Sequence, residues 1–142
     1  MNIYFACSIT GGREFEAVYQ AITAALLDDG HEVPTAHLAG ADVVALEQIV
    51  QPGEVYGRDV AWIRACDALI AEVSTPSHGV GYEIGYALGL GKPVLCCHQA
   101  GRSVSKMITG NPDPGLTVRA YTGEGQAVQI VREFLSNIQS RL

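Results

Sequence analysis

Short apolar runs alternate with helical stretches along this chain, and no other feature of the sequence constrains the fold as strongly. The runs predict five strands, at residues 3–7, 31–33, 68–73, 94–97 and 116–121. Most of the stretches between them predict helices, because their apolar residues recur at helical spacing. We therefore predict one α/β domain over residues 1–142, a Rossmann-like (flavodoxin-like) five-stranded parallel sheet with helices on both faces.

The loop after the first predicted strand contains small and hydroxyl residues directly before a helix. Parallel α/β sheets bind ligands at the carboxyl ends of their strands, so this loop is a candidate binding site. Its sequence matches neither a Walker motif nor GxGxxG, and a plain strand-to-helix turn explains it equally well. The candidate substrate-binding residues here are Cys7, Ser8, Ile9, Thr10, Gly11, Gly12 and Arg13.

The loop after the third predicted strand, residues 74–83, is more informative. Ser77 and the backbone amide of Gly79 face the strand ends, where the positive end of a helix dipole favours a phosphate. We expect Glu83 in the first turn of that helix, where a carboxylate can simply satisfy the helix terminus. However, the helix is otherwise apolar and rich in glycine and alanine, and a buried carboxylate needs a reason.

Other polar residues are ambiguous when taken one at a time. Asp59, on a helix predicted from Pro52 to about Cys66, is by itself typical of a solvated residue. Tyr4 lies inside a strand and is by default a core aromatic, and Glu72 receives no role. His37 and His78 have no metal-ligand spacing, so the sequence predicts no metal and no cofactor.

Charge and hydropathy exclude several classes of partner. The net charge is −6 with no basic block, which argues against polymeric DNA or RNA, although backbone amides can hold one phosphate of a mononucleotide. No apolar stretch approaches the ~18 residues needed to cross a bilayer, and the N-terminus lacks the pattern of a signal peptide. The four cysteines form no disulfide framework, so we expect a cytoplasmic protein with reduced thiols and no membrane partner.

Three segments taken together resemble one family across nearly the whole chain. Residues 4–13 are similar to its N-terminal substrate loop, residues 59–63 to its central acidic helix, and residues 71–85 to its most specific signature. The family is the nucleoside 2-deoxyribosyltransferase superfamily. Within it, the chain looks most like the 2'-deoxynucleoside 5'-monophosphate N-glycosidases, with the bacterial CMP hydrolases nearby.

The resemblance implies hydrolysis of the N-glycosidic bond of a (deoxy)nucleoside 5'-monophosphate to a free base and (deoxy)ribose 5-phosphate. It makes Glu83 the nucleophile at C1', Asp59 the acid/base residue and Tyr4 the phenol that orients the nucleophile. The chemistry agrees, because an oxocarbenium-like transition state needs a nearby carboxylate and the departing base needs a proton.

The resemblance also implies how the substrate is held. Ser8, Ser77 and Gly79 would cradle the 5'-phosphate, and His37 joins the candidate substrate-binding residues. Ser105 would reach the phosphate in the neighbouring subunit, which implies a homodimer with shared sites. Two residues of the first loop depart from the family pattern: Cys7 stands where relatives usually have glycine, and Thr10 stands where the mammalian branch has arginine. We expect Cys7 to pack at the strand end.

Two alternatives remain. A deoxyribosyltransferase would exchange bases between unphosphorylated nucleosides, but such enzymes typically bring a C-terminal asparagine-containing tail into the neighbouring site. Here residues 136–142 lie in a predicted amphipathic helix. A nucleotide-binding sensor could use the same fold without catalysis, although the presence of Tyr4, Asp59 and Glu83 together weighs against it.

Overall fold

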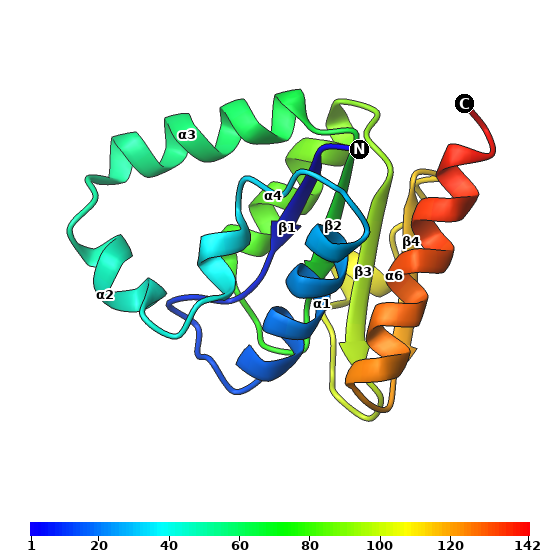
Figure 1. The fold of residues 1–142 in the computed structure, drawn as a ribbon, viewed down its shortest axis with the longest axis horizontal. Helices are drawn as coiled ribbons and strands as arrows, with labels where there is room; N and C mark the ends of the chain where they lie inside the picture. Colours follow the sequence, from blue (N-terminus) through cyan, green and yellow to red (C-terminus); the bar gives the residue numbers. More distant parts are fainter.

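Four parallel strands form the central sheet of the computed structural model, which describes all residues from 1 to 142 (Figure 1). They lie side by side in the order of the sequence, and each pairs in parallel with the next. The strands are β1 (Ile3–Ala6), β2 (Ala68–Glu72), β3 (Val94–Gln99) and β4 (Leu116–Tyr121).

Helices cover both faces of the sheet, as predicted. Because successive strand residues point to opposite faces, Ile3 and Phe5 pack under α1 and α6, whereas Tyr4 and Ala6 pack under α3 and α4. Figure 1 shows α1 and α6 over the near face. The long helices are α1 (Glu16–Asp28), α3 (Pro52–Ala65), α4 (His78–Gly89) and α6 (Glu124–Gln139), and the short ones are η1 (Ala36–Ala39), α2 (Val43–Gln48) and α5 (Lys106–Thr109). No helix is both long and apolar enough to span a membrane.

The predicted strand at residues 31–33 is wrong, because only one bridge forms there, between Asn2 and Glu32. The backbone amide of Ile3 donates to the carbonyl of Glu32 at 2.8 Å. Pro34 follows almost at once; it has no N–H to extend the pairing, and the chain turns into η1. This bridge lies on the edge of β1 that faces away from β2. The chain therefore passes from β1 to one side, at Glu32, and then returns to the other side, at β2. Folds of this kind bind ligands where the strand order reverses, which is here between the carboxyl ends of β1 and β2.

The loops that follow β1 and β2 touch each other at this end of the sheet. A Cβ added to Gly11 would lie 2.4 Å from the carbonyl oxygen of Pro76, so only glycine permits this approach. The second loop is also tied to the rest of the sheet through Glu72, the one charged residue among the buried ones. Its carboxylate accepts from the amide of Ser74 at 2.6 Å and from the hydroxyl of Tyr121 at 3.3 Å.

Candidate active site

A cleft of about 470 Å³ opens beyond the carboxyl ends of β1 and β2, bordered by α2, α3 and the first turns of α4. It brings together side chains from both predicted loops and from the acidic helix. The residues that line it are Cys7, Ile9, Thr10, Glu47, Val50, Pro52, Val55, Tyr56, Asp59, Val60, Ile63, Ser77, Gly79, Val80, Tyr82 and Glu83.

Tyr4 and Glu83 meet beside this cleft. Tyr4 lies in β1 with its side chain fully buried, and its hydroxyl donates a hydrogen bond to Oε2 of Glu83. Glu83 lies in the second turn of α4, not the first as predicted, because the helix begins at His78. Its carboxylate therefore points to the phenol rather than capping the helix, and Tyr4 is more than a core aromatic.

The environment of Glu83 brings its ionisation close to neutral pH. Burial, assisted by the nearby Asp59 carboxylate, raises the pKa of Glu83 to about 7, and the hydrogen bond from Tyr4 limits the rise. Burial and the adjacent Glu83 hold the pKa of Tyr4 far above its usual value, so the phenol remains a donor. A carboxylate poised in this way can act as a nucleophile near neutral pH.

Asp59 is the second carboxyl group of the cleft, and it is not a solvated helix residue: its side chain is 19% exposed. Its Oδ1 accepts from Nε of Arg58 at 2.8 Å. Burial raises the pKa of Asp59, whereas the Arg58 guanidinium opposes the rise. A carboxyl group with a raised pKa can give a proton to a leaving group and later take one from water.

Three residues of the first loop line the cleft, namely Cys7, Ile9 and Thr10. The thiol of Cys7 is buried, donates to the carbonyl of Leu38 at 3.6 Å, and has its pKa raised by burial to about 12. It packs at the strand end and is no nucleophile. Ser8 is fully buried, and its Oγ has no hydrogen-bond partner within the chain.

The rest of the first loop holds the loop itself in place. Gly11 and Gly12 are exposed, and neither lines the cleft. Arg13 turns away from the cleft: its guanidinium donates to the carbonyl of Ser8 at 2.9 Å, to that of Leu38 at 3.0 Å and to that of Gly40 at 2.9 Å. These bonds clamp the loop to η1, and Arg13 does not line the cleft in this arrangement.

Ser77 and Gly79 form the other wall, at the N-terminus of α4. The Oγ of Ser77 caps the helix by accepting from the amide of Val80 at 3.3 Å. A Cβ on Gly79 would lie 3.9 Å from Oε1 of Glu83, so the glycine keeps the space beside the carboxylate open. The uncapped amides of this first turn, together with the helix dipole, favour an anion next to Glu83.

The last two predicted site residues, His37 and Ser105, also do not line the cleft of a single chain. His37 is at its border, with Nε2 3.8 Å from Oε1 of Glu47 and its ring edge-on to Trp62. Ser105 is exposed, caps α5, and lines a separate cavity of about 690 Å³ that it shares with Ser77. No group of three or more histidine, cysteine, aspartate or glutamate side chains could hold a metal ion.

Sequence reasoning missed Glu47, Arg58, Tyr56 and Tyr82. Tyr56 could have been found, because it precedes Asp59 by three positions and therefore shares its face of α3. Arg58 and Tyr82 are chain neighbours of the two carboxylates. Glu47 carried no signal, because the sequence of residues 38–52 has neither a clear helical nor a clear strand pattern.

Comparison with known proteins gives one consistent result. The model of the family described as nucleoside 2-deoxyribosyltransferase matches residues 3–131. A Methanosarcina mazei protein named 2'-deoxynucleoside 5'-phosphate N-hydrolase 1 is 40% identical over 94% of this chain and 83% of its own. An Esox lucius protein named 5-hydroxymethyl-dUMP N-hydrolase is 40% identical over 97% of this chain and 98% of its own.

Solved structures agree on the fold. That of Clostridium botulinum CMP N-glycosidase BcmB superposes with a TM-score of 0.68, covering 92% of this chain and 97% of the other, at 20% sequence identity. A 2-deoxyribosyltransferase from Bacillus psychrosaccharolyticus superposes with a TM-score of 0.61 over 89% of each chain, at 22% identity.

Proposed function

This chain belongs to the nucleoside 2-deoxyribosyltransferase family, and from that premise we propose that it hydrolyses the N-glycosidic bond of (deoxy)nucleoside 5'-monophosphates. The products are a free base and (deoxy)ribose 5-phosphate. The observation that carries the proposal is the hydrogen bond from Tyr4 to Glu83 beside a cleft that also contains Asp59. The names of the relatives, which are nucleotide N-hydrolases, support the same reaction.

In the first step, ionised Glu83 attacks C1' as the bond to the base breaks, and an ester between Glu83 and the sugar forms. The pair of electrons from the broken bond leaves with the base, so the base needs a proton. Asp59, whose pKa is raised by burial, supplies it.

In the second step, water attacks C1' and releases Glu83. Asp59, now ionised, takes a proton from that water, as expected when one residue serves as acid and then as base. Tyr4 donates to Glu83 in the free enzyme and again to the carboxylate that is regenerated, which improves its quality as a leaving group.

The start of α4 holds the 5'-phosphate, which the sugar carries on C5'. The amides of this turn and the hydroxyl groups of Ser8 and Ser77 offer donors without any basic side chain. The unpartnered Oγ of Ser8 is one of them. We also propose that Ser105 completes the phosphate site of a neighbouring subunit, because its hydroxyl is exposed and does not line the cleft of its own chain.

The compartment is a further part of the proposal. All four cysteines are free and buried, which is the usual condition in a reducing compartment. We place the reaction in the cytoplasm on that ground.

One assay tests the function. Nucleosides and nucleoside 5'-monophosphates are incubated with the wild-type protein and with Glu83→Ala, and the free base is followed by chromatography. We expect base release from monophosphates only, reduced on the order of a thousandfold or more in Glu83→Ala. Glu54→Ala is the matched control, because Glu54 is exposed and does not line the cleft.

The other outcomes are equally distinct. If an added second base is incorporated into a nucleoside, the protein is a transferase and not a hydrolase. If monophosphates bind and no base is released, the protein is a nucleotide-binding sensor. Full activity of Glu83→Ala would overturn the role of the carboxylate.

A further inference from the structure

The charged side chains that line the cleft are all acidic: Glu47, Asp59 and Glu83. The proposed reaction uses Asp59 and Glu83, and it gives no role to Glu47. Glu47 lies in α2, and its side chain is only 14% exposed. A third carboxylate facing the same cleft would oppose the anionic substrate unless it made a contact of its own.

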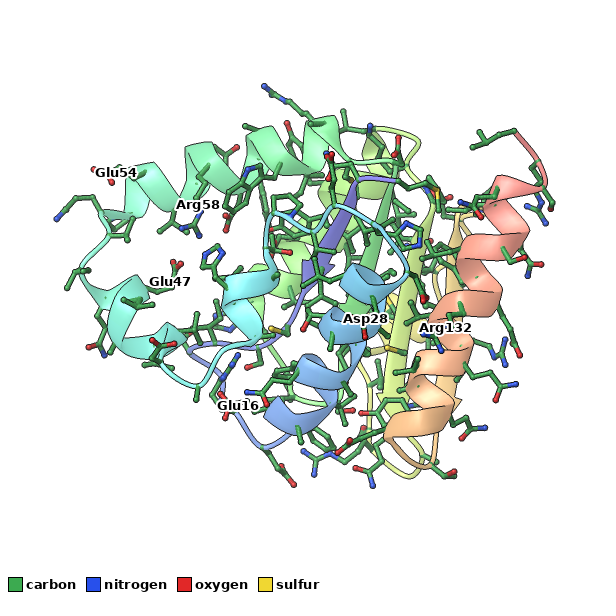
Figure 2. All side chains as sticks on the ribbon, viewed as in Figure 1. Glu16, Asp28, Glu47, Glu54, Arg58 and Arg132 are labelled. Atoms are coloured by element: carbon green, nitrogen blue, oxygen red, sulfur yellow. The ribbon has the colours of Figure 1, made fainter.

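One guanidinium holds two of these carboxylates together. Arg58 approaches both oxygens of Glu47, with Nη1 3.1 Å from Oε1 and Nη2 3.4 Å from Oε2. Its Nε donates to Oδ1 of Asp59 at 2.8 Å. Figure 2 shows Glu47 on α2 and Arg58 on α3 pointing toward each other, whereas Glu54 points away from both. Glu47 is therefore a fixed neighbour of Asp59.

The position of Glu47 corresponds to the end of the cleft that receives the base. The phosphate end is marked by Ser77 and Gly79 on α4, and Asp59 is the residue that serves the leaving base. Glu47 is joined to Asp59 through Arg58 and approaches the cleft from α2, whereas Ser77 and Gly79 approach it from α4. Apolar and aromatic side chains of the same region offer surfaces for a flat ring, namely Val50, Pro52, Val55 and Tyr56.

The chemistry of Glu47 limits what it can recognise. An ionised carboxylate only accepts hydrogen bonds, and it has about four lone-pair directions. Arg58 occupies two of them, and Nε2 of His37 lies 3.8 Å from Oε1. The remaining ones can accept from an N–H or O–H group. A carbonyl oxygen in the same place would meet the carboxylate with its lone pairs and lose its own hydrogen bonds to water.

We propose that Glu47 selects the base: it accepts a hydrogen bond from an exocyclic amino or hydroxyl group on the outer edge of the leaving base and disfavours a substituent that cannot donate. The substrates are then monophosphates whose base bears such a donor. This inference rests on the proposed function, because the orientation of the base depends on the phosphate end and on Asp59.

Two matched substrate pairs test it. In the first pair, dCMP bears an exocyclic amino group where dUMP bears a carbonyl. In the second pair, 5-hydroxymethyl-dUMP bears a hydroxyl group that dTMP lacks. We expect kcat/KM to favour the donor-bearing member on the order of tenfold in at least one pair. In Glu47→Gln the ratio should fall toward one, because an amide offers both a donor and an acceptor, and Glu54→Gln should keep the wild-type ratio.

A ratio within a pair cancels any general effect of the substitution on Asp59 through Arg58. Calorimetric binding of the same four nucleotides to Glu83→Ala, with and without Glu47→Gln, supplies a readout that needs no turnover. Absence of a preference in both pairs, or a preference that Glu47→Gln leaves intact, overturns the proposal. A preference in binding that Glu47→Gln removes supports the proposal even if the wild-type protein releases no base, and absence of release from the wild-type protein would count against the hydrolysis alone.

Discussion

At the scale of single residues, the site depends on one carboxyl group in an environment that disfavours its charge. Burial raises the pKa of Glu83 to about 7, and the phenol of Tyr4 is the main group that opposes the rise. Without that donor, the charged form would lose the one strong hydrogen bond that compensates its desolvation. We therefore infer that Tyr4 positions Glu83, the proposed nucleophile, and also controls the pH at which Glu83 is ionised.

The variant Tyr4→Phe should shift the pH dependence of base release. Only ionised Glu83 attacks, so kcat/KM should rise with pH through about 7 on the acid side of the wild-type profile. A hydrogen bond to the charged form lowers a pKa, so its loss raises the pKa of Glu83 further. We expect the acid limb to move upward by about one pH unit, which a pH series of kcat/KM measures.

The matched control for this shift is Tyr121→Phe. Tyr121 is also buried and also donates to a carboxylate, but that carboxylate is Glu72, which does not line the cleft. Loss of the Tyr121 hydroxyl should lower the stability of the protein and leave the acid limb of the kcat/KM profile at the wild-type pH. An unchanged limb in Tyr4→Phe would show that the phenol does not govern the ionisation of Glu83.

At the scale of elements, the site is built from two strand-to-helix loops that support each other. The contact is close at Gly11, where the ideal Cβ position lies 2.9 Å from Oγ of Ser8 as well as 2.4 Å from the carbonyl oxygen of Pro76. Both neighbours belong to the proposed phosphate cradle or adjoin it. The spacing between the loops is therefore set by the absence of a side chain.

Gly11→Ala should separate the two loops. The methyl group meets a backbone oxygen that cannot rotate away, so we expect a loss of stability of about 1–3 kcal/mol in urea unfolding. Because the separation falls at the phosphate end, KM for monophosphates should rise more than kcat falls.

Gly57→Ala is the matched control, since Gly57 lies inside α3 with nothing within 4 Å of a Cβ. It should gain up to about 1 kcal/mol of stability from helix propensity and keep its KM. A Gly11→Ala variant with wild-type KM would mean that the spacing of the loops does not set phosphate affinity.

At the scale of the whole molecule, our proposal is that a second copy of the chain completes the site. The cavity that contains Ser105 is bounded by the start of α4 on one side and by residues 103–108 and Asn111 on the other. Met107 within that border is 83% exposed, a large apolar side chain that a second subunit would cover.

A mixing experiment tests the shared site. Ser105→Ala should weaken kcat/KM about tenfold by removing one hydrogen bond to the charged phosphate, and Glu83→Ala should be inactive. When the two variants are unfolded together and refolded, about half of the dimers pair unlike chains, and each such dimer has one intact site, so about a quarter of the wild-type sites return. Activity equal to the sum of the separate variants would exclude a shared site.

Much of this molecule could be predicted from local patterns in its sequence. The alternation of apolar runs and helical stretches indicated a parallel sheet covered on both faces, and therefore the edge at which a ligand binds. An acidic residue in a helix of small apolar residues marked Glu83 before any partner was visible. These features depend on residues that are close together in the sequence, and the spacing of apolar residues along the chain therefore predicts them.

The partners of those residues were decided by the tertiary structure. Tyr4 and Glu83 are 79 positions apart, and only the pairing of β1 with β2 and the packing of α4 bring the phenol to the carboxylate. The same is true of Arg13, which donates to the carbonyl of Leu38 in η1, and of Glu47 in α2, which meets Arg58 in α3. Periodicity tells which face of an element a side chain occupies, but which side chains meet across two elements depends on register and crossover, which no local pattern encodes.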